Sequence, residues 1–130
     1  NDFVVIAAGG GGVPVIKTEK GLEGIAAVID KDFTTAKLAE QLDADILIVL
    51  TAVEKVAIRY NPPEADWLDQ LSAEEARAHI ATHEFAAGSM LPKMEAALTF
   101  IESKKGRKAL ITSLEKAREA LDGKTGTWIM

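Results

Sequence analysis

The stretch GIAAVIDKDFTTAKLAEQLDADILIVLT, residues 24–51, decides the fold class of this protein. It opens with a short apolar run at 24–29 and closes with a uniformly apolar run at 46–50, which we expect to be a strand buried on both faces. Between the two runs, residues 33–42 space their apolar side chains along one face of a helix, and Asp32 is the expected N-cap. A strand, a helix and a second strand in this order predict an α/β unit with parallel strands.

The rest of the chain continues this alternation of strands and helices. A capping box formed by Ser72 and Glu75 marks the start of one helix. Strands are expected at 3–8, 56–60, 107–113 and 125–130, and helices at 72–83, 91–104 and 114–121. We therefore predict an α/β fold with an open, mainly parallel sheet sandwiched by helices, formed by residues 1–130 as one unit.

The composition excludes several classes of site. The chain has no cysteine, so a disulfide, a thiolate metal site and a thiol nucleophile are all excluded. Its net charge is −5 and its basic residues are scattered, which argues against a nucleic-acid partner. No apolar run approaches the roughly 20 residues that span a bilayer, and the first residues do not resemble a signal peptide. We expect a cytoplasmic protein with no membrane partner.

Four segments are expected to meet at the carboxyl edge of the predicted sheet, where open α/β proteins bind their ligands. They are the glycine run 9–12, the D-K-D at 30–32, Thr51, and Thr112 with Ser113. Glycines let backbone N–H groups approach a phosphate or a small anion, although this run lacks the lysine of a Walker A loop. A flexible turn is the other interpretation, so the coincidence of the four segments matters more than any one of them.

Two lysines are candidates for phosphate binding. Lys31 lies within D-K-D, where its charge can neutralise phosphate oxygens while Asp30 orients it or holds Mg²⁺. The simpler interpretation is a capping acid with solvated charges, and Asp32 is expected to be that cap. Lys93 follows Pro92 in the first turn of its helix, where the helix dipole favours an acid over a lysine. This local conflict indicates a function for Lys93.

Two other groups have simpler explanations than catalysis. His79 and His83 have the i, i+4 spacing of zinc proteases but lack the accompanying Glu and a third ligand, so we expect a surface pair and no metal site. Ser113 has no nearby histidine in the sequence to activate it as a nucleophile.

Taken in order, four segments resemble the carbamate kinases of the amino-acid kinase family. They are VIAAGGGGVPVI (5–16), GIAAVIDKDFTTAKLAEQLDADILIVLTAVEKVAI (24–58), GSMLPKMEAALTFI (88–101) and KALITSLEKAREALDGKTGT (108–127). The glycine loop before V-P-V and the VIDKD segment are more similar to carbamate kinases than to N-acetylglutamate or uridylate kinases. The resemblance covers nearly the whole chain, and it implies that residues 1–130 correspond to the carboxy-terminal, nucleotide-binding half of such a kinase domain.

The resemblance implies a phosphotransferase. The reaction would be reversible phosphoryl transfer between carbamoyl phosphate and ADP, giving ATP and carbamate, in arginine or related nitrogen catabolism. The cofactors would be ATP or ADP together with Mg²⁺. Such chemistry depends on positioning and charge stabilisation and needs no protein nucleophile, so the lack of cysteine does not count against it.

The resemblance also assigns roles to individual residues. Lys31 and Lys93 would contact the transferred phosphoryl group and the nucleotide phosphates, and Asp30 would organise Lys31. The acceptor, carbamate or carbamoyl phosphate, would face the loop of Gly9, Gly10, Gly11 and Gly12. The adenosine would lie along Thr51, Val53 and Val56, with Tyr60 and Met90 near the base.

Carbamate kinases are more than twice the length of this chain. We therefore expect the chain alone to have little activity and its partner to be a missing amino-terminal half, and the resemblance leaves a homodimer open. Two alternatives stand beside this hypothesis. One is a sister amino-acid kinase that acts on another small acceptor, and the other is a non-catalytic nucleotide-binding module.

Overall fold

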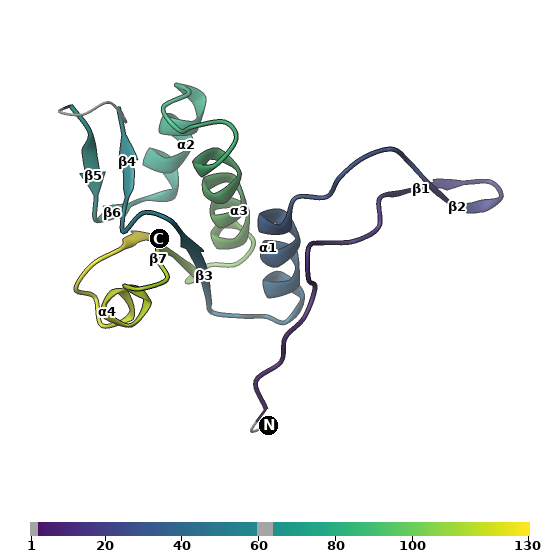
Figure 1. The fold of residues 1–130 in the computed structure, drawn as a ribbon, viewed down its shortest axis with the longest axis horizontal. Coiled ribbons are helices and arrows are strands. Elements are labelled where there is room, and N and C mark those ends of the chain that lie inside the picture. The colour runs from purple at the N-terminus through teal and green to yellow at the C-terminus, as the bar shows by residue number, and fades with distance from the viewer. Residues whose placement is uncertain (1–2, 60–63) are drawn as a thin grey trace.

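The computed structural model describes residues 3–59 and 64–130 and confirms the α/β fold with a mainly parallel sheet (Figure 1). The central sheet has the strand order β3-β7-β8-β6. Strands β3 and β7 are parallel, as are β6 and β8, whereas β7 and β8 are antiparallel. The bounds of these strands are Ile46–Thr51 for β3, Gln70–Leu71 for β6, Lys108–Ser113 for β7 and Thr127–Ile129 for β8.

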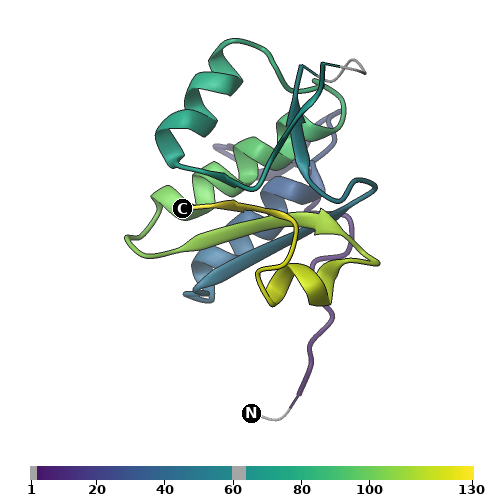
Figure 2. The ribbon, with the colours of Figure 1, turned by 90° about the vertical axis from the view of Figure 1, so that its left-hand side faces the viewer.

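Helices lie on both sides of this sheet (Figures 1 and 2). One side carries α1 (Lys31–Gln41), α2 (Ala73–Ala81) and α3 (Met90–Glu102), and the other carries the short α4 (Ala117–Leu121). The main core lies under α3, whose Met94 and Phe100 are fully buried with Ala109 and Ile111 of β7. None of the helices in the described part of the chain has the length and apolarity that a membrane crossing requires.

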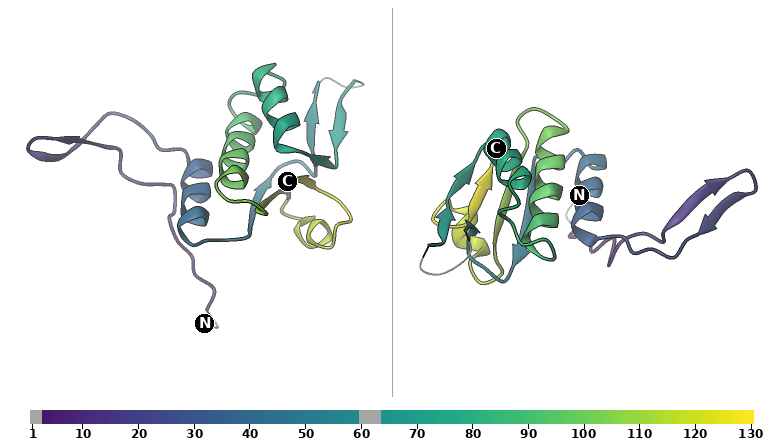
Figure 3. Two further views of the ribbon diagram at one scale, coloured as in Figure 1. Left: turned by 180° about the vertical axis from the view of Figure 1, so that it is seen from behind. Right: turned by 90° about the horizontal axis from the view of Figure 1, so that it is seen from above.

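Two antiparallel hairpins extend from this body. The first pairs β1 (Val15–Thr18) with β2 (Gly21–Gly24) and projects away from the helices as an arm (Figures 1 and 3). The second pairs β4 (Val56–Ile58) with β5 (Asp66–Leu68). The second hairpin is tied to the sheet, because the backbone N–H of Val56 donates to Thr127 Oγ1 at 2.8 Å.

Elements with strong local signals form where the sequence predicts them. The capping box is present: Ser72 Oγ accepts from the Glu75 backbone N–H, and the Glu75 carboxylate accepts from the Ser72 backbone N–H at 2.8 Å. The predicted helix at 91–104 and the strands at 107–113 and 125–130 are also confirmed, as α3, β7 and β8. The helix expected at 114–121 is shorter and begins only at Ala117.

Two predicted strands are wrong. Residues 3–8 form no strand, and their apolar side chains from Phe3 to Ile6 are exposed. Residues 24–29 form none either, because Gly24 ends β2 and the chain from 25 to 30 has no ladder partner among the described residues. An apolar run becomes a strand only where a neighbouring strand satisfies its backbone N–H and C=O groups. Neither segment has such a neighbour here.

Two other predictions need correction. Strand β3 is buried on one face only, through Leu47 and Val49, while its opposite face is exposed. The strand expected at 56–60 is seen as β4 over Val56–Ile58, and its end at Tyr60 lies outside the described residues.

Candidate functional site

A charged cluster joins the starts of α1 and α3. The Asp32 carboxylate accepts a hydrogen bond from Lys93 Nζ at 3.0 Å, and Lys31 Nζ lies 3.8 Å from the same oxygen. The side chains of Lys93 and Asp32 are only 14% and 10% exposed, whereas that of Lys31 is 64% exposed. One carboxylate therefore fixes a mostly buried lysine and lies beside a second lysine that reaches into solvent.

The first turn of α1 explains how Asp32 comes to hold these lysines. Asp30, not Asp32, is the N-cap, because its side chain accepts from the Asp32 backbone N–H at 2.7 Å. The prediction that Asp32 caps the helix is therefore wrong. Only one acid can take the cap position, and the second one, two residues later, is left to face α3. The expected role of Asp30 in organising Lys31 stays a prediction, whereas the acid that bonds Lys93 is Asp32.

Lys93 connects this cluster to the first turn of α3. Its Nζ also donates to the Ser89 carbonyl at 3.4 Å. Ser89 is the N-cap residue of α3 but makes no side-chain cap bond, and the first turn of the helix contains no acid. A helix start of this kind presents its positive dipole end without a compensating carboxylate of its own. The local conflict noted for Lys93 in the sequence is resolved by a distant acid, Asp32.

Ser89 also lines a cavity of about 190 Å³. It lies at the carboxyl end of β3 and is mainly apolar. Its walls are Thr51, Ala52, Val53, Lys55, Ala57, Glu84, Ala86, Ser89 and Met90. The structure thus brings together three of the residues predicted to line an adenosine site, Thr51, Val53 and Met90. They share the cavity wall with Ser89, whose carbonyl accepts from Lys93 Nζ.

Two residues predicted for the adenosine site are not in this wall. Val56 is fully buried at the start of β4 and packs in the main core. Tyr60 lies outside the described residues.

The glycine run lies against the start of α1. Gly11 has φ +128°, and a Cβ at this position would lie 3.0 Å from Thr34 Oγ1 and 3.3 Å from the Ile29 side chain. Only glycine fits such an approach at that backbone angle. The structure therefore places the predicted acceptor loop, Gly9 to Gly12, beside the helix that carries Lys31 and Asp32.

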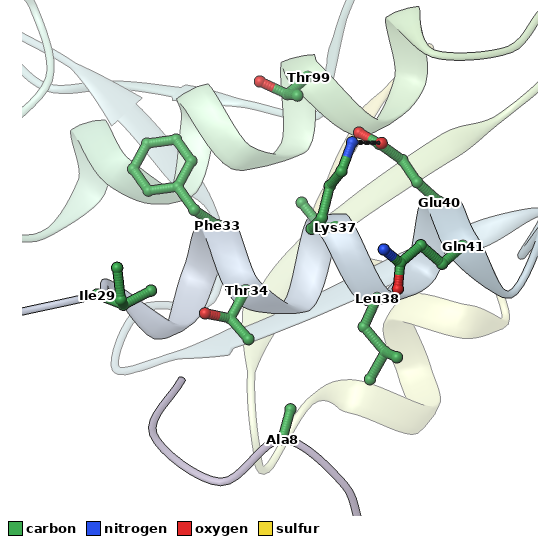
Figure 4. A pocket seen from close by; sticks show the side chains of 10 residues that line it. Ala8, Ile29, Phe33, Thr34, Lys37, Leu38, Glu40, Gln41 and Thr99 are labelled. Atoms are coloured by element: carbon green, nitrogen blue, oxygen red, sulfur yellow. Dashed lines mark hydrogen bonds and ion pairs between the residues drawn. The ribbon is translucent and has the colours of Figure 1, made fainter. Parts of the chain in front are cut away.

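A larger cavity, of about 530 Å³, lies along α1 (Figure 4). Its walls include Ile29, Phe33 and Leu38, and Ala8 lies across from the helix. Its two charged side chains, Lys37 and Glu40, pair with each other at 2.6 Å. The charged residues around Asp32 and Lys93 do not line this cavity. Because its own lysine is already paired with Glu40, the cavity offers a mainly apolar surface with no unpaired cation for a phosphate.

Asp32 is the site residue whose role sequence reasoning missed. The available signal was the presence of two acids around one lysine in D-K-D, since a single N-cap can use only one of them. No metal-binding group of three His, Asp or Glu side chains exists among the residues that the structure describes. His79 instead lies with its Nδ1 3.5 Å from Glu84 and its ring edge-on to Phe85.

The amino acid kinase family matches this chain over residues 1–113. The chain belongs to that family. Among curated members, it is 57% identical over 126 residues to the carbamate kinase-like protein YqeA of Escherichia coli (strain K12). The match covers 97% of this chain and 41% of that protein. It is 51% identical to carbamate kinase 2 of Staphylococcus aureus (strain Mu50), with 97% of this chain and 40% of the relative covered.

Solved structures of this family show the same fold. Carbamate kinase from Giardia lamblia bound to AMP-PNP superposes with a TM-score of 0.84 at 42% identity, over 93% of this chain and 38% of the other. The chain thus spans about 40% of the length of the curated relatives that it matches. The sequence-based assignment to the amino acid kinases, and their carbamate kinase branch in particular, is confirmed as a similarity.

Proposed function

We propose that this chain is the nucleotide-binding part of a carbamate kinase, an enzyme that transfers a phosphoryl group between carbamoyl phosphate and ADP. The observation that carries this proposal is the Asp32 carboxylate, which holds Lys93 at 3.0 Å and lies 3.8 Å from Lys31. Lys93 also donates to the carbonyl of Ser89, a wall residue of the apolar cavity. The relatives named as carbamate kinases, one of them bound to AMP-PNP, support it.

In this proposal the two lysines carry the electrostatic part of the reaction. A β-phosphate oxygen of ADP attacks the phosphorus of carbamoyl phosphate, the bond from phosphorus to the carbamoyl oxygen breaks, and carbamate leaves. The transition state is loose and its charge is spread over the phosphoryl oxygens, so fixed cations are the main contribution a protein makes. Lys93 is held in place by Asp32, while the exposed Lys31 is able to adjust to the moving group.

The cavity receives the base end of the nucleotide. Its volume of about 190 Å³ is smaller than the roughly 300–1,000 Å³ of complete small-molecule sites. It therefore suits the adenine of ADP, with the phosphates lying outside it towards Lys93. Thr51, Val53 and Met90 would contact the adenosine, and Tyr60 and Val56 stay predictions for this role. The loop Gly9 to Gly12 would face the carbamoyl group.

Mg²⁺ fits this site as a partner of the nucleotide. Both acids of the site are already engaged, Asp30 with the Asp32 backbone N–H and Asp32 with Lys93. Mg²⁺ commonly binds through substrate phosphates with only one or two carboxylates. Each acid uses one oxygen in these bonds, Asp30 Oδ1 and Asp32 Oδ2, so both keep a second oxygen that could contact the ion. When bound, the ion would neutralise phosphate charge alongside the lysines.

Calorimetric titration of Mg-ADP into the chain tests the proposal. We expect saturable binding, weakened about 10-fold or more in Lys93→Met, because a hydrogen bond to a charged group contributes roughly 1.5–3 kcal/mol. The matched control is Lys105→Met, which removes an exposed lysine beyond the opposite end of α3. No binding by the folded chain, or equal affinity in both variants, would contradict the proposal.

The isolated chain is proposed to have little catalytic activity. Phosphoryl transfer requires donor and acceptor to be fixed together, and the relatives carry more than twice this length of chain. A coupled assay for ATP synthesis from carbamoyl phosphate and ADP should therefore stay near background. Robust turnover by the 130 residues alone would show that they form a complete active site.

A further inference from the structure

The turn that ends α2 has a backbone conformation that is unusual for its sequence. The His83 backbone N–H donates to the Ile80 carbonyl, and the Glu84 backbone N–H donates to the His79 carbonyl, both at 3.1 Å. These two bonds form a Schellman motif, in which the residue after the C-cap is left-handed and is usually glycine. Here that residue is His83, with φ +58°. The turn fixes the direction in which the chain leaves α2, and Glu84 is the first residue after it.

The turn brings Glu84 to the cavity that the proposed function assigns to the base of the nucleotide. Glu84 lines this cavity together with Thr51, Val53 and Met90. Its side chain is 28% exposed, and the next residue, Phe85, is buried in the main core. The Glu84 backbone is therefore held between a hydrogen-bonded turn and a buried aromatic ring, which gives its side chain a defined origin in the cavity wall.

The Glu84 carboxylate is oriented and still has acceptor capacity. Its Oε1 accepts from Thr82 Oγ1 at 3.1 Å and lies 3.5 Å from His79 Nδ1. Both contacts use the same oxygen, and a carboxylate can accept at both of its oxygens. The wall also contains Lys55, whose Nζ pairs with Asp69 at 2.5 Å, so that this cation is already neutralised. The cavity therefore offers a ligand an anionic acceptor, Oε2 of Glu84.

We propose that Glu84 selects the base of the nucleotide by accepting a hydrogen bond from the exocyclic amino group of adenine. The inference rests on the proposed function, since it takes the cavity to hold the base of ADP. An ionised carboxylate accepts hydrogen bonds and cannot donate them. It therefore favours adenine, whose 6-amino group is a donor, and disfavours a base with an oxygen at position 6.

The number of available oxygens favours adenine over guanine. Guanine carries two adjacent donors, N1–H and the 2-amino group, which match the two oxygens of one carboxylate. In Glu84 one of these oxygens is already engaged by Thr82. The remaining oxygen suits the 6-amino group of adenine, which needs only one acceptor.

Calorimetric titrations of Mg-ADP, Mg-IDP and Mg-GDP into the chain test this role. ADP and IDP differ only at the base, where IDP has an oxygen in place of the amino group. We expect the wild type to bind Mg-ADP at least about 10-fold more tightly than either 6-oxo nucleotide, because a hydrogen bond to a charged group is lost. Glu84→Gln should bring the affinities for ADP and IDP to within about threefold, because an amide can accept from the amino group or donate to the oxygen.

The matched control is Glu19→Gln, which makes the same change in the exposed turn between β1 and β2 and should leave the preference for ADP unchanged. Circular dichroism of both variants establishes that they fold. An unchanged preference in Glu84→Gln would overturn the proposal. So would wild-type affinities for ADP and IDP that are equal, or tighter binding of Mg-GDP than of Mg-ADP, and these two results do not depend on the folding of any variant.

The two proposals fail separately. Nucleotide binding that Lys93→Met weakens but that is indifferent to the base would leave the phosphate site in place and remove the role of Glu84. A folded chain that binds none of the three nucleotides would contradict both proposals.

Discussion

Replacing Asp32 by asparagine isolates the interaction on which the proposed site depends. The two residues have the same shape, and the Asp32 backbone N–H still donates to Asp30, so the helix cap is retained. What is lost is the charge facing Lys93 at 3.0 Å. At that distance the attraction is about 5.5 kcal/mol for an effective dielectric constant of about 20.

The net effect on stability is smaller than this attraction. Burial of both groups has already cost desolvation energy, which offsets part of it, but removing one partner leaves the other charge buried and unpaired. We expect Asp32→Asn to lower the free energy of unfolding by about 2–4 kcal/mol. Lys31 gives an internal comparison, since it approaches the same carboxylate at 3.8 Å but is mostly exposed. Lys31→Met should cost about 0–1 kcal/mol.

Urea unfolding of a double-mutant cycle is the assay. Asp32→Asn, Lys93→Met and the double variant should give a coupling energy of about 1–3 kcal/mol, because the two side chains contact each other. The same cycle with Lys31→Met should give a coupling near zero. Equal coupling for both lysines, or a shift below about 0.5 kcal/mol for Asp32→Asn, would refute the view that Asp32 holds Lys93 in place.

Three further changes test the fold. Phe100→Ala should lower the free energy of unfolding by about 3–5 kcal/mol, measured in urea, since this side chain is fully buried. Gly126→Ala should lower the thermal midpoint, at a cost of about 2–4 kcal/mol, because φ is +80° and the new Cβ would lie 2.8 Å from Leu110 Cδ1; an unchanged midpoint would contradict this packing. Hydrogen bonding and attraction from Lys104 lower the pKa of Asp43 below its ordinary value of 3.8. The contribution of the Asp43 carboxylate to folding stability is therefore complete above pH 3.8 and is lost as the pH falls through the lowered pKa. In acid titrations monitored by circular dichroism, the stability of Asp43→Asn should approach that of the wild type at low pH.

The sequence alone determined those features that arise within one or two turns of chain. The Ser72–Glu75 capping box and the start of α3 were correctly predicted, since caps and helical periodicity act between residues three or four apart. The family was also carried by the sequence, through a glycine loop, a D-K-D and a P-K pair in a fixed order. These signals were sufficient to name both lysines of the candidate site.

Only the tertiary structure decided which acid contacts the two lysines, Lys31 and Lys93. Asp30 and Asp32 are equivalent as caps by local rules. In the structure Asp30 is the cap, and Asp32 contacts Lys93, 61 residues away in sequence. It likewise decided that residues 3–8 are not a strand and that β3 is covered on one face only. The physical reason is the same in each case. Ion pairs, ladder hydrogen bonds and buried faces need a partner from elsewhere in the fold, and no local pattern shows whether that partner is present.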